Sequence, residues 1–350
     1  MKFIEINGRK IGSEFAPYII AEVSANHNGD LNKALKLIEI AKDSGADAVK
    51  IQTYTADTMT VDSDMEDFQI KGGLWDGYTL YKLYEEAHTP WDWHKPIFER
   101  AKELGITVFS TPFDESSVNF LMDLDVPAFK IASFEMTDLP LVEYIAKQGK
   151  PIIMSTGMAS PEEIEESINV IKKYNQQIIV LHCVSGYPTP IDQSNLSTIK
   201  EISKRFDVVS GLSDHTLGTA ASVAGVALGA SVIEKHFTES RSEKGPDSEF
   251  SLEPSELESL VNETRSVWNS VRSTPFKRES AEKVNLKFRR SIYFVRDLEE
   301  GEEITLDSVK RIRPGYGLEP KYFNEIIGKK VLRKVSKNTP VKLLDIDMGK

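Results

Sequence analysis

Short apolar runs alternate with segments of helical period between residues 18 and 238. The run at 18–21, for example, is followed at 31–43 by apolar residues with the spacing of an amphipathic helix. The alternation continues along the chain. It predicts eight strands with helices between them, and the strands fall at 18–21, 48–51, 107–109, 128–131, 151–154, 178–181, 208–211 and 232–234.

Three local signals refine this pattern. The Asn-Gly dipeptide at 7–8 predicts a hairpin before the main domain. Ser160 fits the N-cap of a helix at 161–173, because Glu163 lies three residues further on. Small apolar residues at 217–229 predict a helix between the last two strands, which should therefore be parallel neighbours.

Polar residues follow the end of every predicted strand. A closed (β/α)₈ TIM barrel has its active site at the carboxyl ends of all its strands. An open doubly wound sheet, the competing architecture, would gather such groups at a switch point. The distribution therefore favours the barrel, and the polar residues are Glu22, Lys50, Ser110, Thr111, Lys130, Ser133, Ser155, Thr156, Ser185, Tyr187, Asp214, His215, Glu234 and His236.

Charge divides the chain into an acidic main part and a basic tail. The whole chain has a net charge of −11, whereas residues 286–350 carry 15 Lys and Arg against 10 Asp and Glu. The segment between them, 272–285, is polar and poor in apolar residues, as a linker should be. We therefore expect a barrel domain with its hairpin at 1–271, a linker at 272–285 and a small domain at 286–350. The unequal charge suggests that the tail docks on a barrel, in its own chain or in a partner's.

Composition excludes several classes of protein. The acidic balance argues against nucleic acid as the main partner, because phosphate binding needs concentrated basic residues. No run of 18 apolar residues and no signal peptide pattern occurs, which predicts a cytoplasmic protein without a membrane partner. The single Cys183 rules out an intrachain disulfide and a cysteine-cluster metal site.

Two residue pairs carry the candidate chemistry. His215 and His236 end the last two strand segments, where they could bind a divalent metal or merely hydrogen-bond a loop. Lys50 and Lys130 interrupt apolar strand runs, which favours an anion that carries phosphate or carboxylate. No P-loop or GxGxxG fingerprint is present where a nucleotide would need it.

Residues 18–252 contain, in this order, the motifs IAEVSANHNGD, AVKIQTY, STPFD, FKIAS, STGMAS, HCVSGYPTP, GLSDHT and EKHFT. This ordered series resembles the sialic acid synthase family of phosphoenolpyruvate-dependent nonulosonic acid synthases. The tail, with SIYFVRDLEEGEEITLDSVKRIRPGYGLEP, resembles that family's mostly-β antifreeze-like (SAF, β-clip) domain. The resemblance implies a transferase that condenses phosphoenolpyruvate with an N-acylated amino sugar and releases phosphate.

The resemblance also implies roles for single residues. His215 and His236 match the metal ligands, for Mn²⁺ or Mg²⁺. Arg313 matches an arginine that enters the partner's active site in a domain-swapped homodimer. Glu22 or Glu234 could move protons, a choice that the sequence leaves open. Positions that hold phosphoenolpyruvate match Lys50, Thr111, Lys130, Ser133, Ser155 and Ser213, and positions near the sugar or the reacting centre match Glu22, Gln52, Tyr187, Glu234 and Asp247.

A long excursion at 54–93 carries the pattern GLWxGxTLYxLYEEAxTPWxWH, which looks like the pseudaminic acid synthase branch. Its acceptor is 2,4-diacetamido-2,4,6-trideoxy-L-altropyranose, and the products are pseudaminic acid and phosphate, formed by C–O cleavage. Leu74 or Trp75 could face the C6 methyl group, or the aromatics could only fasten the loop. Legionaminic and N-acetylneuraminic acid synthases remain the alternatives within the family.

Two more distant alternatives are compatible with parts of the sequence. Lys130 or Lys50 could form a Schiff base in a metal-independent aldolase, which would leave the histidines idle. A sugar-binding or ice-binding module is the non-catalytic alternative, and the full rim of Lys, Glu and His groups argues against it.

Overall fold

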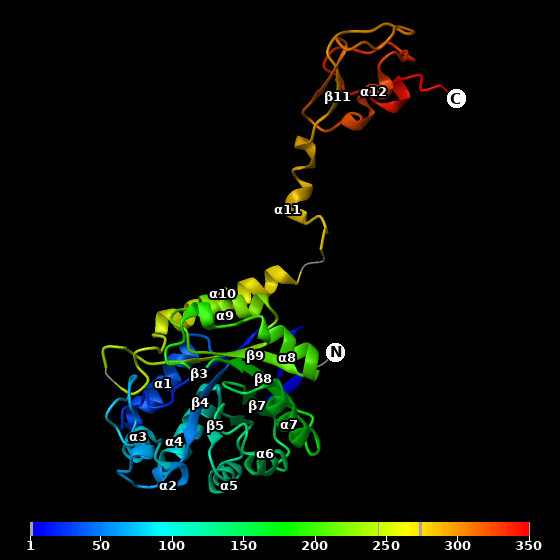
Figure 1. Ribbon diagram of the computed structural model, residues 1–350. Coiled ribbons are helices and arrows are strands. Elements are labelled where there is room, and N and C mark those ends of the chain that lie inside the picture. Colours follow the sequence, from blue (N-terminus) through cyan, green and yellow to red (C-terminus); the bar gives the residue numbers. More distant parts are fainter. Residues whose placement is uncertain (1–2, 244, 273–274, 350) are drawn as a thin grey trace. The chain divides into compact units, whose positions relative to one another are not determined.

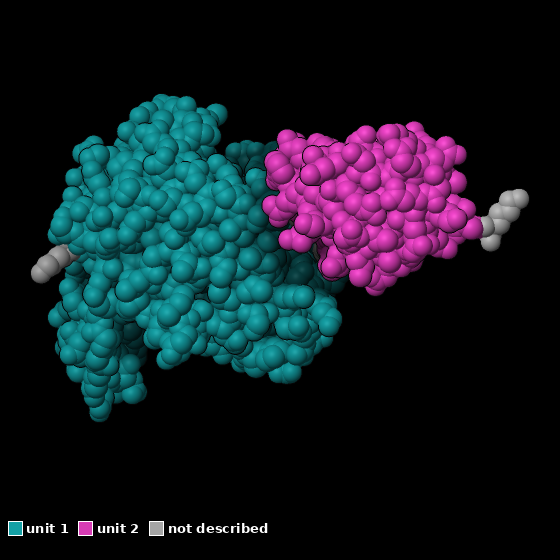
Figure 2. Space-filling view, turned by 90° about the horizontal axis from the view of Figure 1, so that it is seen from above, with its two compact units in different colours: residues 1–272 teal, residues 273–350 magenta. Residues whose placement is uncertain are grey.

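The computed structural model describes residues 3–243, 245–272 and 275–349. The chain divides into two compact units, residues 1–272 and 273–350, each with its own core (Figure 2).

Eight parallel strands of the first unit close into a barrel, in the order β10-β3-β4-β5-β6-β7-β8-β9 (Figure 1). Every predicted strand is present, with ends that differ by no more than a few residues. The TIM barrel prediction is therefore confirmed over the open sheet. The strands are β3 (Tyr18–Glu22), β4 (Ala48–Thr53), β5 (Thr107–Pro112), β6 (Phe129–Ile131), β7 (Ile152–Ser155), β8 (Ile178–Cys183), β9 (Val209–Asp214) and β10 (Val232–His236).

Helices follow the strands and cover the outside of the barrel (Figure 1). The capping box of α7 forms as predicted, because Ser160 and Glu163 each bond the other's backbone N–H. Helix α9 is shorter than predicted, since Gly218 and Gly229 near its ends have positive φ angles of 72° and 106°. The helices are α1 (Leu31–Asp43), α4 (Trp91–Leu104), α5 (Glu115–Asp123), α6 (Leu139–Ala146), α7 (Pro161–Lys172), α8 (Thr198–Phe206), α9 (Ala220–Ala227) and α10 (Pro254–Val271).

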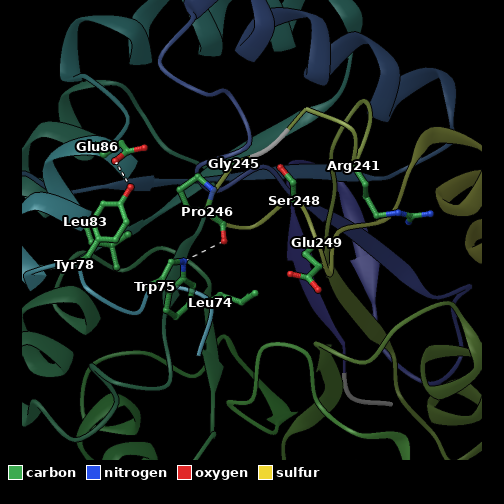
Figure 3. Close-up of a pocket in the computed structure, with 10 residues that line it drawn as sticks. All are labelled: Leu74, Trp75, Tyr78, Leu83, Glu86, Arg241, Gly245, Pro246, Ser248 and Glu249. Atoms are coloured by element: carbon green, nitrogen blue, oxygen red, sulfur yellow. Dashed lines mark hydrogen bonds between the residues drawn. The ribbon is translucent and has the colours of Figure 1, made fainter. Parts of the chain in front are cut away.

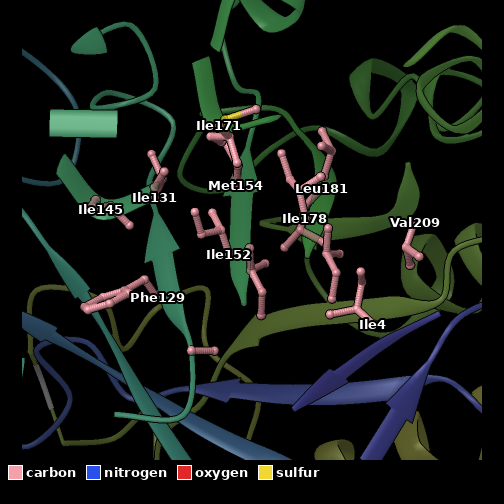
Figure 4. Packing of buried hydrophobic residues seen from close by; sticks show 14 of the residues in the cluster. Ile4, Phe129, Ile131, Ile145, Ile152, Met154, Ile171, Ile178, Leu181 and Val209 are labelled. Carbon is pink, nitrogen blue, oxygen red and sulfur yellow. The ribbon is translucent and has the colours of Figure 1, made fainter. Parts of the chain in front are cut away.

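The N-terminal hairpin closes one end of the barrel. Strands β1 (Ile4–Ile6) and β2 (Arg9–Ile11) pair antiparallel, and Asn7 and Gly8 adopt the positive φ angles of the predicted turn. Ile4 belongs to the same buried cluster as Ile178 and Val209, the first residues of β8 and β9 (Figure 4). The hairpin thus covers the amino ends of the strands.

The excursion after β4 forms short elements beside the opposite end. It contains α2 (Ala56–Met59), the 3₁₀ helix η1 (Glu66–Phe68) and α3 (Leu80–Ala87). Helix α4 starts at Trp91, so the excursion ends at Pro90, three residues before the predicted end at 93. Of the helices in the described part of the chain, none is long and apolar enough to cross a membrane.

The second unit is small and has little regular structure. Strands β11 (Ser291–Phe294) and β12 (Val309–Ile312) pair antiparallel, and isolated bridges join further segments. Buried Ile292, Phe294 and Val341 belong to its core. The unit also contains α11 (Ser280–Lys283), α12 (Phe323–Ile326) and the 3₁₀ helices η3 (Leu286–Phe288), η4 (Pro320–Tyr322) and η5 (Leu343–Asp345). Residues 273–274 of the predicted linker lie outside the described residues.

Candidate active site

Two lysines and two glutamates form a buried charge cluster inside the barrel. Lys50 Nζ lies 2.9 Å from Glu22 Oε2 and 3.8 Å from Glu234 Oε1. Lys130 Nζ lies 3.7 Å from the same Glu234 oxygen. All four side chains are at most 6% exposed. Such charges persist away from water only when they are paired, and here each carboxylate has a cation beside it.

The two carboxyl groups differ in their tendency to hold a proton. Burial raises the pKa of Glu22, and the Glu234 charge adds to this against the opposing Lys50. Burial acts in the same sense on Glu234, but Lys130 and Lys50 together hold its pKa below the ordinary value. Glu234 therefore remains the anion of the pair, and Glu22 takes up a proton more readily.

The lysines differ in a parallel way. Burial lowers the pKa of Lys130 despite the nearby Glu234. Burial acts to lower that of Lys50 too, but Glu22 and Glu234 raise its pKa above the ordinary value. Lys50 is therefore the more firmly held ammonium group.

Hydroxyl groups surround the two ammonium groups. Lys50 donates to Thr111 Oγ1 at 3.3 Å, and Lys130 donates to Ser155 Oγ at 2.7 Å. Ser133 Oγ accepts from the N–H of Gly157 at 3.0 Å. A Cβ at position 157 would lie 2.1 Å from Ser185 Oγ, so only glycine lets these loops meet. Cations, hydroxyls and close backbone together suit a compact anion.

The two histidines meet at the ends of neighbouring strands. Their ring centroids are 5.4 Å apart, and β9 pairs with β10 as predicted. His215 Nδ1 lies 3.1 Å from the carbonyl oxygen of Val184, which can only accept, so Nδ1 carries a proton. Burial acts to lower the pKa of His215, but Cys183 and the Val184 carbonyl raise it above the ordinary value. In the neutral ring Nε2 is left unprotonated, as a metal ligand must be.

The buried Nδ1 of His236 has no hydrogen-bond partner. Burial and the neighbouring His215 hold its pKa well below the ordinary value, so the ring is neutral. The Asp247 Oδ2 atom lies 3.8 Å from this Nδ1 atom, too far for a hydrogen bond. An orphaned, neutral imidazole fits the donor chemistry of a divalent cation better than loop bonding alone.

The protein supplies few ligands beyond this pair. Among the side chains that the structure describes, no group of three or more His, Cys, Asp or Glu is arranged to hold a metal ion. The residues thus fit a cation held by two imidazoles, with water or substrate in the other positions.

A cavity of about 530 Å³ opens beside the histidines. Its inner end is polar, with Gln52, His236 and Asp247, and Gln52 donates to Glu22 Oε1 at 3.0 Å. Its outer end is apolar and is built largely by the excursion after β4, from Met59, Ile70, Leu80, Leu83 and Ala87. A ligand with one polar and one apolar end would match this gradient.

Trp75 forms a wall of this cavity. Its Nε1 donates to the carbonyl of Pro246 at 3.1 Å (Figure 3). Its ring lies 5.8 Å from that of Tyr187. A second cavity, of about 600 Å³, shares Trp75 but also contains Leu74, which is 40% exposed and does not line the first. Of the two predicted candidates, only Trp75 faces the space beside the histidines.

The barrel brings the predicted site residues together at the carboxyl end of its strands, except Arg313. Ser213 donates to Glu234 Oε1 at 3.1 Å, and the Tyr187 ring lies 4.5 Å from His215. Arg313 is exposed in the second unit, directly after β12. Asp214, predicted among the polar groups of the rim, instead turns outward to Ser222 of α9.

Sequence reasoning missed two groups at the site. Glu135 lines the first cavity, and its buried Oε2 has no hydrogen-bond partner. It lies two residues beyond Ser133, so a longer look past the FKIAS motif could have found it. Burial acts to raise the pKa of Cys183, but the His215 imidazole, 3.8 Å away, outweighs this and lowers it to about 7.

Glu135→Gln should make the protein less sensitive to alkaline pH. Burial raises the pKa of Glu135 from an ordinary 4.5 to about 7. Between these values the folded state binds more protons than the unfolded state, so wild-type stability falls as pH rises. The free energy of unfolding of the variant should exceed that of wild type by up to about 3 kcal/mol at pH 8, and by little at pH 4.5.

Urea unfolding at both pH values measures this difference. Glu166→Gln, at an exposed position on α7, is the control. If the free energies of unfolding of Glu135→Gln and wild type differed by the same amount at both pH values, the Glu135 carboxyl group would ionise normally.

Comparison with known proteins identifies the family. The sequence matches the NeuB family over residues 37–285 and the SAF domain over residues 289–347. It is 46% identical to a pseudaminic acid synthase from Campylobacter jejuni subsp. jejuni over 319 residues, or 91% of this chain and 93% of that one. It is 41% identical to a pseudaminic acid synthase from Helicobacter pylori over 339 residues, or 95% of this chain and 98% of that one.

Solved structures agree with this assignment. The crystal structure of N-acetylneuraminic acid synthetase from Leptospira borgpetersenii superposes with a TM-score of 0.74 at 33% identity, covering 81% of this chain and 95% of that one. The predicted resemblance to sialic acid synthases is thus confirmed. The chain belongs to the NeuB family and carries a SAF domain in its second unit.

Proposed function

We propose that this chain is a pseudaminic acid synthase. It would condense phosphoenolpyruvate with 2,4-diacetamido-2,4,6-trideoxy-L-altropyranose and water, and release pseudaminic acid and phosphate. The observation that carries the proposal is the buried pair Lys50 and Lys130, of which Lys50 is joined through Glu22 to Gln52 at the polar end of a cavity whose other end is apolar. The names of its relatives support the choice of acceptor.

The proposed phosphoenolpyruvate site is the lysine pair. Two ammonium groups, with the hydroxyls of Thr111 and Ser155 bonded to them, would neutralise a phosphate and a carboxylate. Glu22 and Glu234 hold these cations in place before the substrate arrives. Such preorganised charge is the largest contribution that this chain's own residues would make to the reaction.

The acceptor would lie in the first cavity with its reacting carbon toward His236. Its C6 would then point to the apolar end formed by the excursion after β4. A methyl group buried there gains about 0.8 kcal/mol, whereas a hydroxyl would lose its water without a partner. This polarity supports a 6-deoxy acceptor over N-acetylmannosamine.

His215 and His236 would hold a divalent cation, Mn²⁺ or Mg²⁺. When bound, such a cation supplies Lewis acidity to the aldehyde oxygen of the open-chain sugar. Val184 fixes the tautomer of His215 through its carbonyl, and burial keeps His236 neutral. These two features prepare both rings to ligate a metal.

Glu22 is the proposed proton carrier. C3 of phosphoenolpyruvate attacks the aldehyde carbon, and Glu22 gives its proton to the resulting alkoxide. Water then adds at C2 and returns a proton to Glu22. The C2–O bond to phosphate breaks, the new C2 hydroxyl becomes the ketone, and its proton leaves with the phosphate. Its raised pKa suits this double role, while Glu234 stays ionised between the lysines.

Arg313 is the proposed contribution of a second chain. It is exposed in the second unit, which carries the SAF domain. In a homodimer with exchanged small domains, its guanidinium would reach the substrates in the partner's barrel. The acidic main part and basic tail of the sequence are compatible with such docking.

Phosphate release tests the proposed function. Enzyme, phosphoenolpyruvate and Mn²⁺ are combined with the altro acceptor, the legionaminic acid precursor or N-acetylmannosamine, each with and without EDTA. We expect the highest kcat/KM with the altro sugar, and loss of activity with EDTA. A preference for another sugar would keep the mechanism and exclude this branch. Activity that withstands EDTA would exclude the metal.

A further inference from the structure

An ion pair lies behind the two histidines, on the side of the barrel wall that faces α9. Asp214 ends β9, and Lys235 is the penultimate residue of β10. Their charged groups are 3.0 Å apart, and only 1% of either side chain is exposed. Ser222 of α9 donates to Asp214 Oδ2 at 2.5 Å. Since successive residues of a strand face opposite sides, the next residue after each member of the pair faces inward.

The pair also holds the backbone directly after His215. The N–H of Thr216 donates to Asp214 Oδ1 at 2.8 Å, and its carbonyl accepts from Lys235 Nζ at 2.6 Å. The N–H and the carbonyl of Thr216 thus both form hydrogen bonds with buried charged groups. Such hydrogen bonds are stronger than those between neutral groups. His215 is enclosed between two residues that the pair fixes.

The strands are packed closely below the pair. A Cβ at Gly211 would lie 2.5 Å from the carbonyl oxygen of Val232, so only glycine allows β9 this close to β10. A buried ion pair adds little net stability, because desolvation offsets the attraction. Stability alone therefore gives a poor reason for two charges at this place, and control of geometry gives a better one.

We propose that Asp214 and Lys235 are positioning residues that set the separation of His215 and His236 and so the affinity of the site for a divalent cation. Asp214 precedes one imidazole and Lys235 precedes the other, so their contact ties the two strand ends together. The inference rests on the proposed function, because it takes the imidazoles as the metal ligands.

Mn²⁺ binding to the purified full chain, without substrates, tests the inference by electron paramagnetic resonance. The variant Asp214→Asn/Lys235→Met removes both charges at similar volume, and Lys235→Arg is the conservative replacement. Ile178→Ala, at the far end of β8, is the matched control for lost stability. Thermal unfolding shows that each variant is folded at the binding temperature.

We expect the Mn²⁺ Kd of the double variant to rise about 10- to 100-fold, with partial recovery in Lys235→Arg. Ile178→Ala should bind as wild type does despite a lower Tm. Unchanged Mn²⁺ affinity in a folded double variant would overturn the inference alone, and would leave the pair a purely structural role. A wild-type protein that binds no Mn²⁺ would overturn it together with the proposed metal site.

Discussion

Lys130→Met lowers kcat/KM for phosphoenolpyruvate by about 100- to 1,000-fold if the lysine pair holds this substrate. Methionine fills the volume of the lysine stem but provides no charge and no donor to Ser155. Glu234 also loses one of the two cations that lower its pKa, so the pH profile of the remaining activity should move upward. Steady-state phosphate release from pH 5 to 9 measures both effects.

Lys147→Met is the matched control for Lys130→Met, because Lys147 is an exposed lysine that pairs with Glu143 on α6. It should leave the kinetics unchanged. If the kcat/KM of Lys130→Met for phosphoenolpyruvate were within threefold of the wild-type value, Lys130 would have no part in binding this substrate.

Mixed dimers of Lys130→Met and Arg313→Ala chains should recover activity that neither parent has. The two chains are coexpressed with different tags, and purification on both tags isolates the mixed dimer. Only the barrel of its Arg313→Ala chain keeps Lys130. If the small domains are exchanged between the two chains, that barrel receives Arg313 from the other chain. The mixed dimer should then show about half of the wild-type activity. Arg313→Ala alone should lose at least about tenfold, since a charged donor to the substrate is gone.

Lys310→Ala, an exposed change on β12, controls for effects on the small unit. An inactive mixed dimer would show that Arg313 serves its own chain. Full activity of the Arg313→Ala homodimer would exclude any part for this residue in turnover.

The barrel could be predicted because its strands are apolar runs of regular spacing. Lys50 and Lys130 stood out for the same reason, as single charges within such runs, and the structure confirms that both are buried. Their pairing with Glu22 and Glu234 depends on how four separate strands come together around the barrel. No local pattern carries that information.

The excursion after β4 shows where pattern reasoning ends. Its short helices lack the length for a clear period, so the sequence alone left Leu74 and Trp75 as equal candidates. The hydrogen bond from Trp75 to Pro246, 171 residues away in the chain, holds the Trp75 side chain, and not that of Leu74, at the wall of the cavity. Glu135 was missed because an isolated acidic residue after a strand is usually a solvated loop residue.

Asp214 illustrates a different difficulty. The sequence places it at the end of a strand, directly before His215, and successive residues of a strand face opposite sides, so the two side chains cannot both point into the barrel. Its direction is set by Lys235 and Ser222, which supply the partners that a buried carboxylate needs. Neighbours in space, which the sequence does not display, decided its role.

The hairpin covers the amino ends of the barrel strands, and the cavity beside the histidines lies at their carboxyl ends. Lys50 and Lys130 sit within their strands, whereas Gln52, His236 and Asp247 line the cavity further out. A ligand bound to the two lysines would therefore be covered by a ligand that occupies the cavity. The ligand on the lysines would enter before the ligand in the cavity and leave after it.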